Sequence, residues 1–162
     1  MQKKIKSPIT ESAVIKTPFS KLELVFDSGV LVSVDLFTRK SLLAAQSGEA
    51  RDVCQQVSDY CSKKIFEFDI DLKVNGSLFQ RKVWQALREI PAGNVLTYGE
   101  LAQQLKTSAR AVGNACRANP LPLVIPCHRV VAKSGLGGFA GAQAGTPVRI
   151  KQWLLEHEGV SV

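Results

Sequence analysis

The sequence predicts two domains, an α/β domain over residues 1–75 and a mainly α domain with a helix-turn-helix over residues 76–162. Three observations predict this fold class. Strand-like runs surround one amphipathic stretch in the first half, and capped helical stretches dominate the second half. Between the halves lies Val74-Asn75-Gly76, a turn sequence. At 162 residues, the chain is long enough to form two small domains.

The first half has the pattern of a small sheet with one helix. Residues 21–26 and 30–37 are strand-like runs joined by Asp27-Ser28-Gly29, which predicts a hairpin. Apolar side chains at helical spacing predict a helix over roughly residues 48–62. Residues 66–72 alternate apolar and acidic side chains. This alternation predicts a half-buried edge strand with a solvated acidic face, and no metal cluster.

The second half has three candidate helices that each follow a potential N-cap residue. These residues are Ser77, Thr97, which opens a capping-box sequence, and Ser108. The helix after Ser108, over residues 109–118, is rich in alanine and glycine and carries Arg110. Two short helices joined by a tight turn, the second narrow and basic, are typical of a helix-turn-helix. A helix packed closely on its neighbours fits this composition equally well.

The formal net charge of +7 is unevenly distributed along the chain. Residues 1–75 hold 11 basic and 10 acidic side chains, whereas residues 76–162 hold 10 basic and 4 acidic ones, a net of +6. A basic half suits a polyanionic partner, because phosphate neutralisation drives much of DNA binding. Charge alone leaves open a basic surface with no particular partner.

Hydropathy and cysteine usage indicate the compartment. No apolar run approaches the ~20 residues that span a bilayer, so no membrane association is expected. The basic residues 1–6 are followed by no apolar stretch, which argues against a signal peptide. We therefore expect a cytoplasmic protein whose four cysteines are reduced thiols.

Residues 119–131, Asn-Pro-Leu-Pro-Leu-Val-Ile-Pro-Cys-His-Arg-Val-Val, contain the candidate nucleophile. Three prolines exclude a regular helix and predict an extended, stiff segment that presents Cys127 and His128. A thiol attacks carbon as the thiolate, so a nearby base or cation has to activate it. The chain's two histidines, His128 and His157, are the candidate bases. A Cys-His dipeptide by itself is equally compatible with a small core cysteine.

Taken whole, the segment of residues 119–131 resembles the active-site signature of the O6-alkylguanine-DNA alkyltransferases. Residues 109–118 resemble the recognition helix of that family, and residues 135–140 and 152–158 resemble its C-terminal elements. The resemblance covers roughly residues 78–158. It implies a ribonuclease-H-like fold for the N-terminal domain and a winged-helix type for the C-terminal domain.

The resemblance also implies an activity and partners. The protein would be a single-turnover methyltransferase that repairs double-stranded DNA containing O6-alkylguanine by direct reversal. Cys127 would accept the alkyl group irreversibly, and a water, His128 and Glu158 would draw the proton off its thiol. No cofactor and a monomeric state are implied. Whether O4-alkylthymine is a substrate stays open.

Other positions take DNA-binding roles from the resemblance. Arg110 would fill the gap left by a flipped nucleotide, and Tyr98 would press on the phosphate beside it. Asn119 would brace the turn before the cysteine, and Lys133 would contact the DNA backbone. The residues implied to line the base pocket are Pro122 and Phe139.

The chain departs from the family pattern in two places. Residues 142–147 lengthen the connection into the last helix, which affects the expected alkyl-size preference. Ala140 lies where some relatives carry a hydroxyl group that touches guanine O6, so a backbone donor would replace it. Some relatives bind a metal in the N-terminal domain, but no such site is expected here. The cysteines interpreted as structural are Cys54, Cys61 and Cys116.

Three other functions compete with alkyl transfer. A lesion-binding protein would recognise damaged DNA without transfer, although relatives of that kind replace the acceptor cysteine. A cysteine hydrolase would pair Cys127 with His128 or His157 and turn over an ester repeatedly. A transcriptional regulator would bind undamaged DNA sequence-selectively, and would normally pair two recognition helices.

Overall fold

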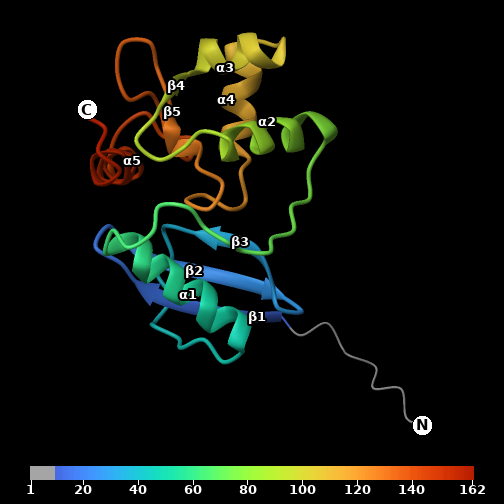
Figure 1. The fold of residues 1–162 in the computed structure, drawn as a ribbon, viewed down its shortest axis with the longest axis vertical. Coiled ribbons are helices and arrows are strands. Elements are labelled where there is room, and N and C mark those ends of the chain that lie inside the picture. Colours follow the sequence, from blue (N-terminus) through green and yellow to red (C-terminus); the bar gives the residue numbers. More distant parts are fainter. Residues whose placement is uncertain (1–9) are drawn as a thin grey trace. The chain divides into compact units, whose positions relative to one another are not determined.

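The computed structural model describes residues 10–162, which divide into two compact units between Lys73 and Val74 (Figure 1). The first unit is α/β and the second is mainly α, so the predicted fold class is confirmed at this level. No helix of residues 10–162 is long and apolar enough to cross a bilayer.

The first unit is built on an antiparallel sheet of three strands in the order β1-β2-β3. The strands are β1 (Thr10–Lys16), β2 (Lys21–Asp27) and β3 (Val30–Asp35). The predicted hairpin joins β2 to β3 through Ser28 and Gly29, whose φ angles of 51° and 86° suit a two-residue turn. Strand β1 was not predicted from the sequence.

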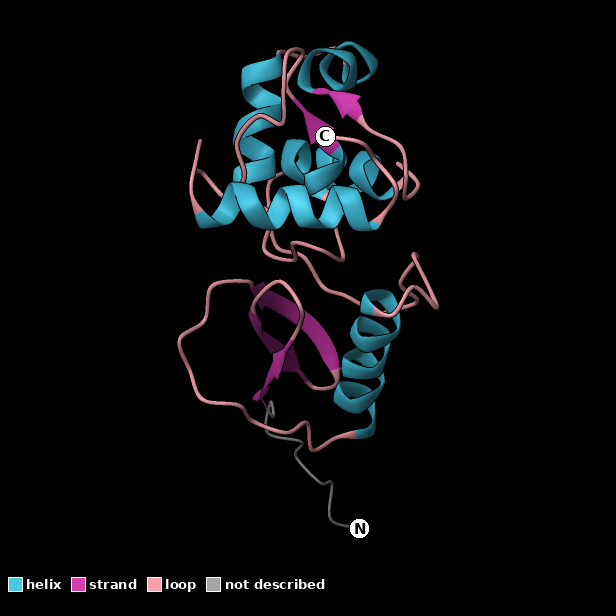
Figure 2. Ribbon diagram, turned by 90° about the vertical axis from the view of Figure 1, so that its left-hand side faces the viewer, coloured by secondary structure: helices cyan, strands magenta, loops and turns pink. Residues whose placement is uncertain are grey.

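Helix α1 (Gly48–Cys61) packs against this sheet (Figure 2), within one residue of its predicted bounds. The Ser47 hydroxyl accepts a hydrogen bond from the N–H of Ala50 and so caps the first turn. Alternate residues of β2 are buried, as expected for a strand with one face on a core. The buried apolar residues of β2 and α1 are Leu22, Leu24, Phe26, Ala50, Val53, Val57 and Tyr60.

The strand predicted over residues 66–72 is wrong. The segment makes one isolated bridge, from Leu72 to Leu31 of β3, and otherwise packs against α1. Gln56 of α1 explains the difference, since its amide donates to the carbonyl oxygen of Asp69 (2.8 Å) and accepts from the Asp69 N–H (2.9 Å). The side chain thereby takes the place of a neighbouring strand. The expected alternation of burial is nevertheless present along residues 69–72.

The second unit contains four α-helices and a short parallel strand pair. Its elements are α2 (Leu78–Arg88), β4 (Leu96–Thr97), α3 (Tyr98–Leu105), α4 (Ala109–Arg117), a 3₁₀ turn (Cys127–Arg129), β5 (Val130–Val131) and α5 (Thr146–His157). Ser77, Thr97 and Ser108 all cap their helices as predicted, each accepting a backbone hydrogen bond. At Thr97 the expected capping box is complete.

Helices α3 and α4 form the helix-turn-helix that the sequence predicted. The turn begins at Lys106, which ends α3 in the left-handed region with φ of 55°. Buried side chains of the pair include Leu101 of α3 and Val112 of α4. A buried hydrogen bond from the Trp84 indole N–H to the carbonyl oxygen of Ala115 (2.8 Å) ties α2 to α4. Ala115 is thus buried against α2, whereas Arg110 is exposed.

The segment before Cys127 is folded, which corrects the expectation of an extended chain. The N–H of Ile125 donates to the carbonyl oxygen of Leu121 (2.8 Å), and Leu123 has φ of 78°. Asn119 stabilises this turn, because its Oδ1 accepts from the Leu121 N–H (2.9 Å) and its Nδ2 donates to the Ile125 carbonyl (2.8 Å). Burial of Leu121 and Ile125 in the core favours the turn over an extended path.

Candidate active site

A solvent-open cavity of about 480 Å³ lies in the second unit, with Cys127 in its wall. Its volume falls within the range of about 300–1,000 Å³ that is usual for small-molecule sites. The wall comes from α3, from α4 and from the loop after β5. The lining residues are Tyr98, Ala109, Arg110, Gly113, Asn114, Cys116, Arg117, Cys127, Ala132, Gly137, Gly138, Phe139, Ala140, Gly141 and Gln143.

Cys127 is the first residue of the 3₁₀ turn and is 7% exposed. Its backbone N–H donates to the carbonyl oxygen of Ile125 (2.8 Å), which fixes the position of the residue. Burial raises the pKa of the Cys127 thiol, whereas the Asn119 side chain and the positive charge of Lys151 act to lower it. The resting group is therefore a thiol, and its attack on carbon requires a proton acceptor.

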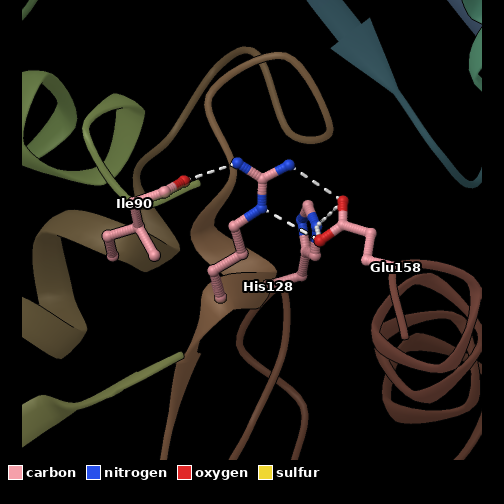
Figure 3. A network of polar contacts seen from close by, with 4 residues as sticks. Ile90, His128 and Glu158 are labelled. Atoms are coloured by element: carbon pink, nitrogen blue, oxygen red, sulfur yellow. Dashed lines mark hydrogen bonds and ion pairs between the residues drawn. The ribbon is translucent and has the colours of Figure 1, made fainter. Parts of the chain in front are cut away.

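His128, which follows Cys127 in the chain, forms a buried network with Arg129 and Glu158 (Figure 3). The Nε2 of His128 lies 3.1 Å from both carboxylate oxygens of Glu158. Arg129 donates to the same carboxylate through Nε and Nη2, both at 2.9 Å, and to the Ile90 carbonyl through Nη1 at 2.6 Å. The carboxylate is thus held by two partners in a fixed orientation.

Burial keeps His128 neutral, and its contact with Glu158 leaves it able to accept a proton. Burial lowers the pKa of His128, although the Glu158 carboxylate acts in the opposite direction. Burial alone would raise the pKa of Glu158, but hydrogen bonds from His128 and Arg129 lower it to about 2. An ionised Glu158 accepts the Nε2–H, which leaves the lone pair on Nδ1. Nδ1 has no hydrogen-bond partner among residues 10–162.

The structure adds two buried cations to the residues that the sequence singled out. Arg129 is 3% exposed, so it belongs to the network and not to a DNA-facing surface. Lys151 of α5 is fully buried and donates to the carbonyl oxygens of Val130 (2.7 Å), Leu136 (2.6 Å) and Gly138 (3.0 Å). Helical spacing could have revealed it, because Lys151 shares a face with the buried Leu154 and Leu155.

The other predicted site residues divide by location. Tyr98, Arg110 and Phe139 line the cavity, and burial raises the pKa of Tyr98 to about 12. Pro122 is not in this wall; it forms a bridge with Ile125 in the turn before Cys127. The remaining predicted contact, Lys133, is exposed and lies outside the wall.

A tight hairpin shapes one edge of the cavity. Phe139 and Ala142 exchange two backbone hydrogen bonds, both 2.9 Å long, across Ala140 and Gly141, whose φ angles are 51° and 81°. The turn brings Gln143 back over Gly138, where a Cβ atom would lie 2.7 Å from the amide nitrogen of Gln143. The lengthened connection therefore contributes a side chain to the cavity wall.

The other cysteines differ in their surroundings. Cys54 and Cys61 lie half-buried on α1, and burial raises the pKa of both. Cys116, interpreted as structural from the sequence, lines the cavity that contains Cys127. Burial raises its pKa to about 12. Among the described residues, no group of three or more potential metal ligands occurs.

The fold and the site together define a class of protein. A helix-turn-helix is a DNA-binding arrangement, and here it forms a wall of the cavity that contains a cysteine beside a neutral histidine. This class combines a nucleic-acid-binding surface with a nucleophilic thiol.

Comparison with known proteins identifies the family. Residues 78–160 match the family model described as 6-O-methylguanine DNA methyltransferase, DNA binding domain. A methylated-DNA–protein-cysteine methyltransferase of Metallosphaera sedula is 34% identical over 144 residues, covering 88% of this chain and 89% of that protein. A protein of the same name from Salmonella typhimurium is 47% identical over 108 residues. That match covers 64% of this chain and 60% of the Salmonella protein, so it spans less than two thirds of the relative's length.

Solved structures agree with the sequence comparison. The O6-methylguanine methyltransferase of Mycobacterium tuberculosis has a TM-score of 0.80 at 32% identity, with 93% of each chain covered. A Mycobacterium tuberculosis structure in complex with DNA has a TM-score of 0.78 at 34% identity, with 91% of each chain covered. The chain belongs to the methylated-DNA–protein-cysteine methyltransferase family.

Proposed function

We propose that this protein repairs alkylated DNA by direct reversal, moving an alkyl group from O6 of guanine in double-stranded DNA to Cys127 once per molecule. The observation that carries the proposal is the position of Cys127, in a cavity lined by a helix-turn-helix and next to the His128–Glu158 pair. The names of the relatives support the same activity, since they are methylated-DNA–protein-cysteine methyltransferases.

The chemistry begins with removal of the thiol proton. A water relays the proton from Cys127 to Nδ1 of His128, and the ionised Glu158 stabilises the imidazolium that forms. Arg129 holds the carboxylate in place during this step. The thiolate then attacks the alkyl carbon, and the carbon–O6 bond breaks as the carbon–sulfur bond forms.

The products explain why each molecule reacts once. Breaking of the carbon–O6 bond leaves guanine as an anion, which takes up at N1 the proton that His128 accepted, so the base is restored without a cofactor and without another substrate. The alkyl group remains on Cys127 as a thioether, which has no good leaving group. The protein is therefore a single-turnover reagent.

Access to the base requires extrusion, because O6 lies inside the duplex. Flipping a nucleotide costs a few kcal/mol, and less for a damaged pair. We propose that Arg110 stacks in the vacated space, that Tyr98 presses on the adjacent phosphate and that Lys133 contacts the DNA backbone. Phe139, 4% exposed in the cavity wall, packs against the extruded base.

Residues 76–162 would then form the DNA-binding and alkyl-transfer domain, with residues 1–75 as a separate α/β domain. The parallel β4–β5 pair beside α3 supports a winged-helix type for the former. The three-stranded antiparallel sheet with one helix supports a ribonuclease-H-like type for the latter.

One acceptor thiol and one helix-turn-helix per chain are sufficient for one lesion, so we propose a monomer. Four free cysteines support a cytoplasmic location.

The decisive test is intact-protein mass spectrometry after mixing with an O6-methylguanine duplex, followed by peptide mapping. We expect one added methyl group per chain, located on Cys127. Cys127→Ser should lose the adduct and keep duplex binding, whereas Cys116→Ser, which changes the other thiol of the cavity, should keep the adduct. A bound duplex without any mass change would favour a lesion-binding protein, and repeated ester turnover would favour a hydrolase.

A further inference from the structure

We propose that Lys151 is a positioning residue of the transfer site. Its buried ammonium group connects strand β5 to the cavity loop, by which we mean residues 132–145 between β5 and α5. The same group provides the positive charge beside which the Cys127 thiolate forms. This inference rests on the proposed function only in one respect, namely that the thiolate attacks an alkyl group of DNA. The charge itself can be tested on the free protein.

The geometry of Lys151 connects two walls of the site. Its Nζ donates to the Val130 carbonyl of β5, which follows the 3₁₀ turn of Cys127, and to the carbonyls of Leu136 and Gly138 in the cavity loop. An ammonium group has three protons, and each has an acceptor between 2.6 and 3.0 Å away. The loop that carries Phe139 is thereby held at a fixed place relative to the cysteine.

The three acceptors do not cancel the charge. All of them are neutral backbone carbonyl groups, and no carboxylate is among the acceptors of Nζ. A buried cation without an anionic partner stabilises a nearby negative charge strongly, because little water screens it. The group able to become negative in the reaction is the Cys127 thiol.

The ionisable groups that face Lys151 are few. They are Tyr98 of α3, whose ring centroid lies 5.7 Å from Nζ, Cys116 of α4, and Cys127 and His128 of the 3₁₀ turn. Burial lowers the pKa of Lys151 to about 8, and both cysteines oppose this shift. The ammonium form therefore predominates at neutral pH. Its charge favours the thiolate and also disfavours a charged His128 before the reaction.

The test is the pH dependence of Cys127 alkylation by iodoacetamide, measured without DNA by mass spectrometry of the Cys127 peptide. Lys151→Met keeps the length of the side chain and removes the charge. We expect alkylation of the variant to be ~10-fold slower than that of the wild type below about pH 8, where Lys151 carries its charge, and equal to it well above that pH. The matched control is Lys82→Met, an exposed lysine of α2 outside the cavity wall, whose profile should equal the wild type.

Removal of a buried ammonium group leaves three carbonyls without a donor, so a second measurement retains Lys151. The Nζ of Lys151 is followed by nitrogen-15 NMR in the wild type and in Cys127→Ser. If thiolate and ammonium stabilise each other, the coupling is reciprocal and the Lys151 midpoint falls in the variant. An unchanged Lys151 midpoint, or a folded Lys151→Met with the wild-type alkylation profile, overturns the inference.

The outcomes also separate this inference from the proposed function. Slower alkylation of Lys151→Met and a lowered Lys151 midpoint in Cys127→Ser, in a protein that accepts no alkyl group from DNA, would support the role of Lys151 and refute alkyl transfer. Transfer from DNA, together with a wild-type alkylation profile of Lys151→Met and an unshifted Lys151 midpoint, would support alkyl transfer and refute the electrostatic role of Lys151.

Discussion

The buried carboxylate of Glu158 is the negative charge that both His128 and Arg129 contact. It accepts two hydrogen bonds from Arg129 and faces Nε2 of His128, so a single charge orients both neighbours. Bidentate pairing with arginine is geometrically specific, and removing one partner of a buried pair leaves the other without compensation. We therefore expect the residue to contribute to stability as well as to the proposed chemistry.

Replacement of the carboxylate by an amide tests both contributions. We expect Glu158→Gln to lower the free energy of unfolding at pH 7 by about 3 kcal/mol, because Arg129 stays buried without its anionic partner. We also expect slower transfer, since the imidazolium of His128 loses its stabilisation. Denaturant unfolding and single-turnover rates measure the two effects. Glu156→Gln, which changes an exposed carboxylate of α5, should leave both unchanged.

Acid should weaken the wild type through the same group. The pKa of Glu158 is depressed to about 2 in the folded chain, below its ordinary value of 4.5. A depressed pKa contributes stability that is present above the unfolded value and is lost as pH falls towards the folded value. The free energy of unfolding should thus decline between about pH 5 and pH 2 in the wild type. A decline of equal size in Glu158→Gln would contradict this assignment.

At the scale of elements, α4 presents Arg110 in its first turn, exposed at the cavity. If this side chain occupies the space of the flipped nucleotide, its removal should slow transfer only from substrates in which the base has to leave the stacked duplex. We expect Arg110→Ala to slow transfer from a duplex by about 10- to 100-fold, which corresponds to a few kcal/mol of extrusion cost. Transfer from the free base O6-benzylguanine should change little.

Rapid-quench rates on both substrates measure this difference. Arg88→Ala removes another exposed arginine, at the end of α2 and outside the cavity wall, and serves as the matched control. Equal slowing of Arg110→Ala on duplex and free base would exclude the stacking role.

The loop between Phe139 and α5 is expected to limit the size of the alkyl group that the cavity accepts. Gln143 lies over Gly138 and narrows the cavity that contains Cys127. We expect Gln143→Ala to raise the rate ratio of O6-benzyl to O6-methyl duplexes roughly tenfold, which corresponds to relief of ~1.4 kcal/mol of crowding. Competition between the two duplexes gives the ratio directly. Gln103→Ala on the exposed face of α3 should leave it unchanged, and an unchanged ratio in Gln143→Ala would exclude crowding by this side chain.

The elements also show where sequence patterns suffice. Helix starts were predictable because Ser77, Thr97 and Ser108 each accept a hydrogen bond from a backbone N–H three residues away. The strand over residues 66–72 was not, because a distant glutamine on α1 takes up its backbone groups. Local signals determine local contacts, whereas the partner of an extended segment depends on the tertiary fold.

For the molecule as a whole, the sequence predicted the candidate reacting residues better than the buried side chains that hold them in place. The motif around Cys127 predicted a nucleophile, and this residue lies in the cavity wall; the contact of His128 with Glu158 is compatible with the roles that the resemblance implied. Arg129 and Lys151 escaped notice because a basic side chain in a basic half is normally solvated. Their burial is set by α5, which packs on the 3₁₀ turn from a distant part of the chain.

This burial changes how the charge of the molecule acts on DNA. Of the ten basic side chains in residues 76–162, two are buried, Arg129 and Lys151, and neither can pair with a phosphate. The contribution of residues 76–162 to the salt dependence of duplex binding should therefore reflect at most the eight that remain. Since each phosphate contact contributes about 0.9 to the slope of log K against log salt concentration, Lys133→Ala should reduce that slope by about 0.9. Lys63→Ala, an exposed lysine of the nearly neutral first unit, should not reduce it. Fluorescence anisotropy over a salt series measures both variants, and equal slopes for Lys133→Ala and the wild type would remove Lys133 from the DNA contact.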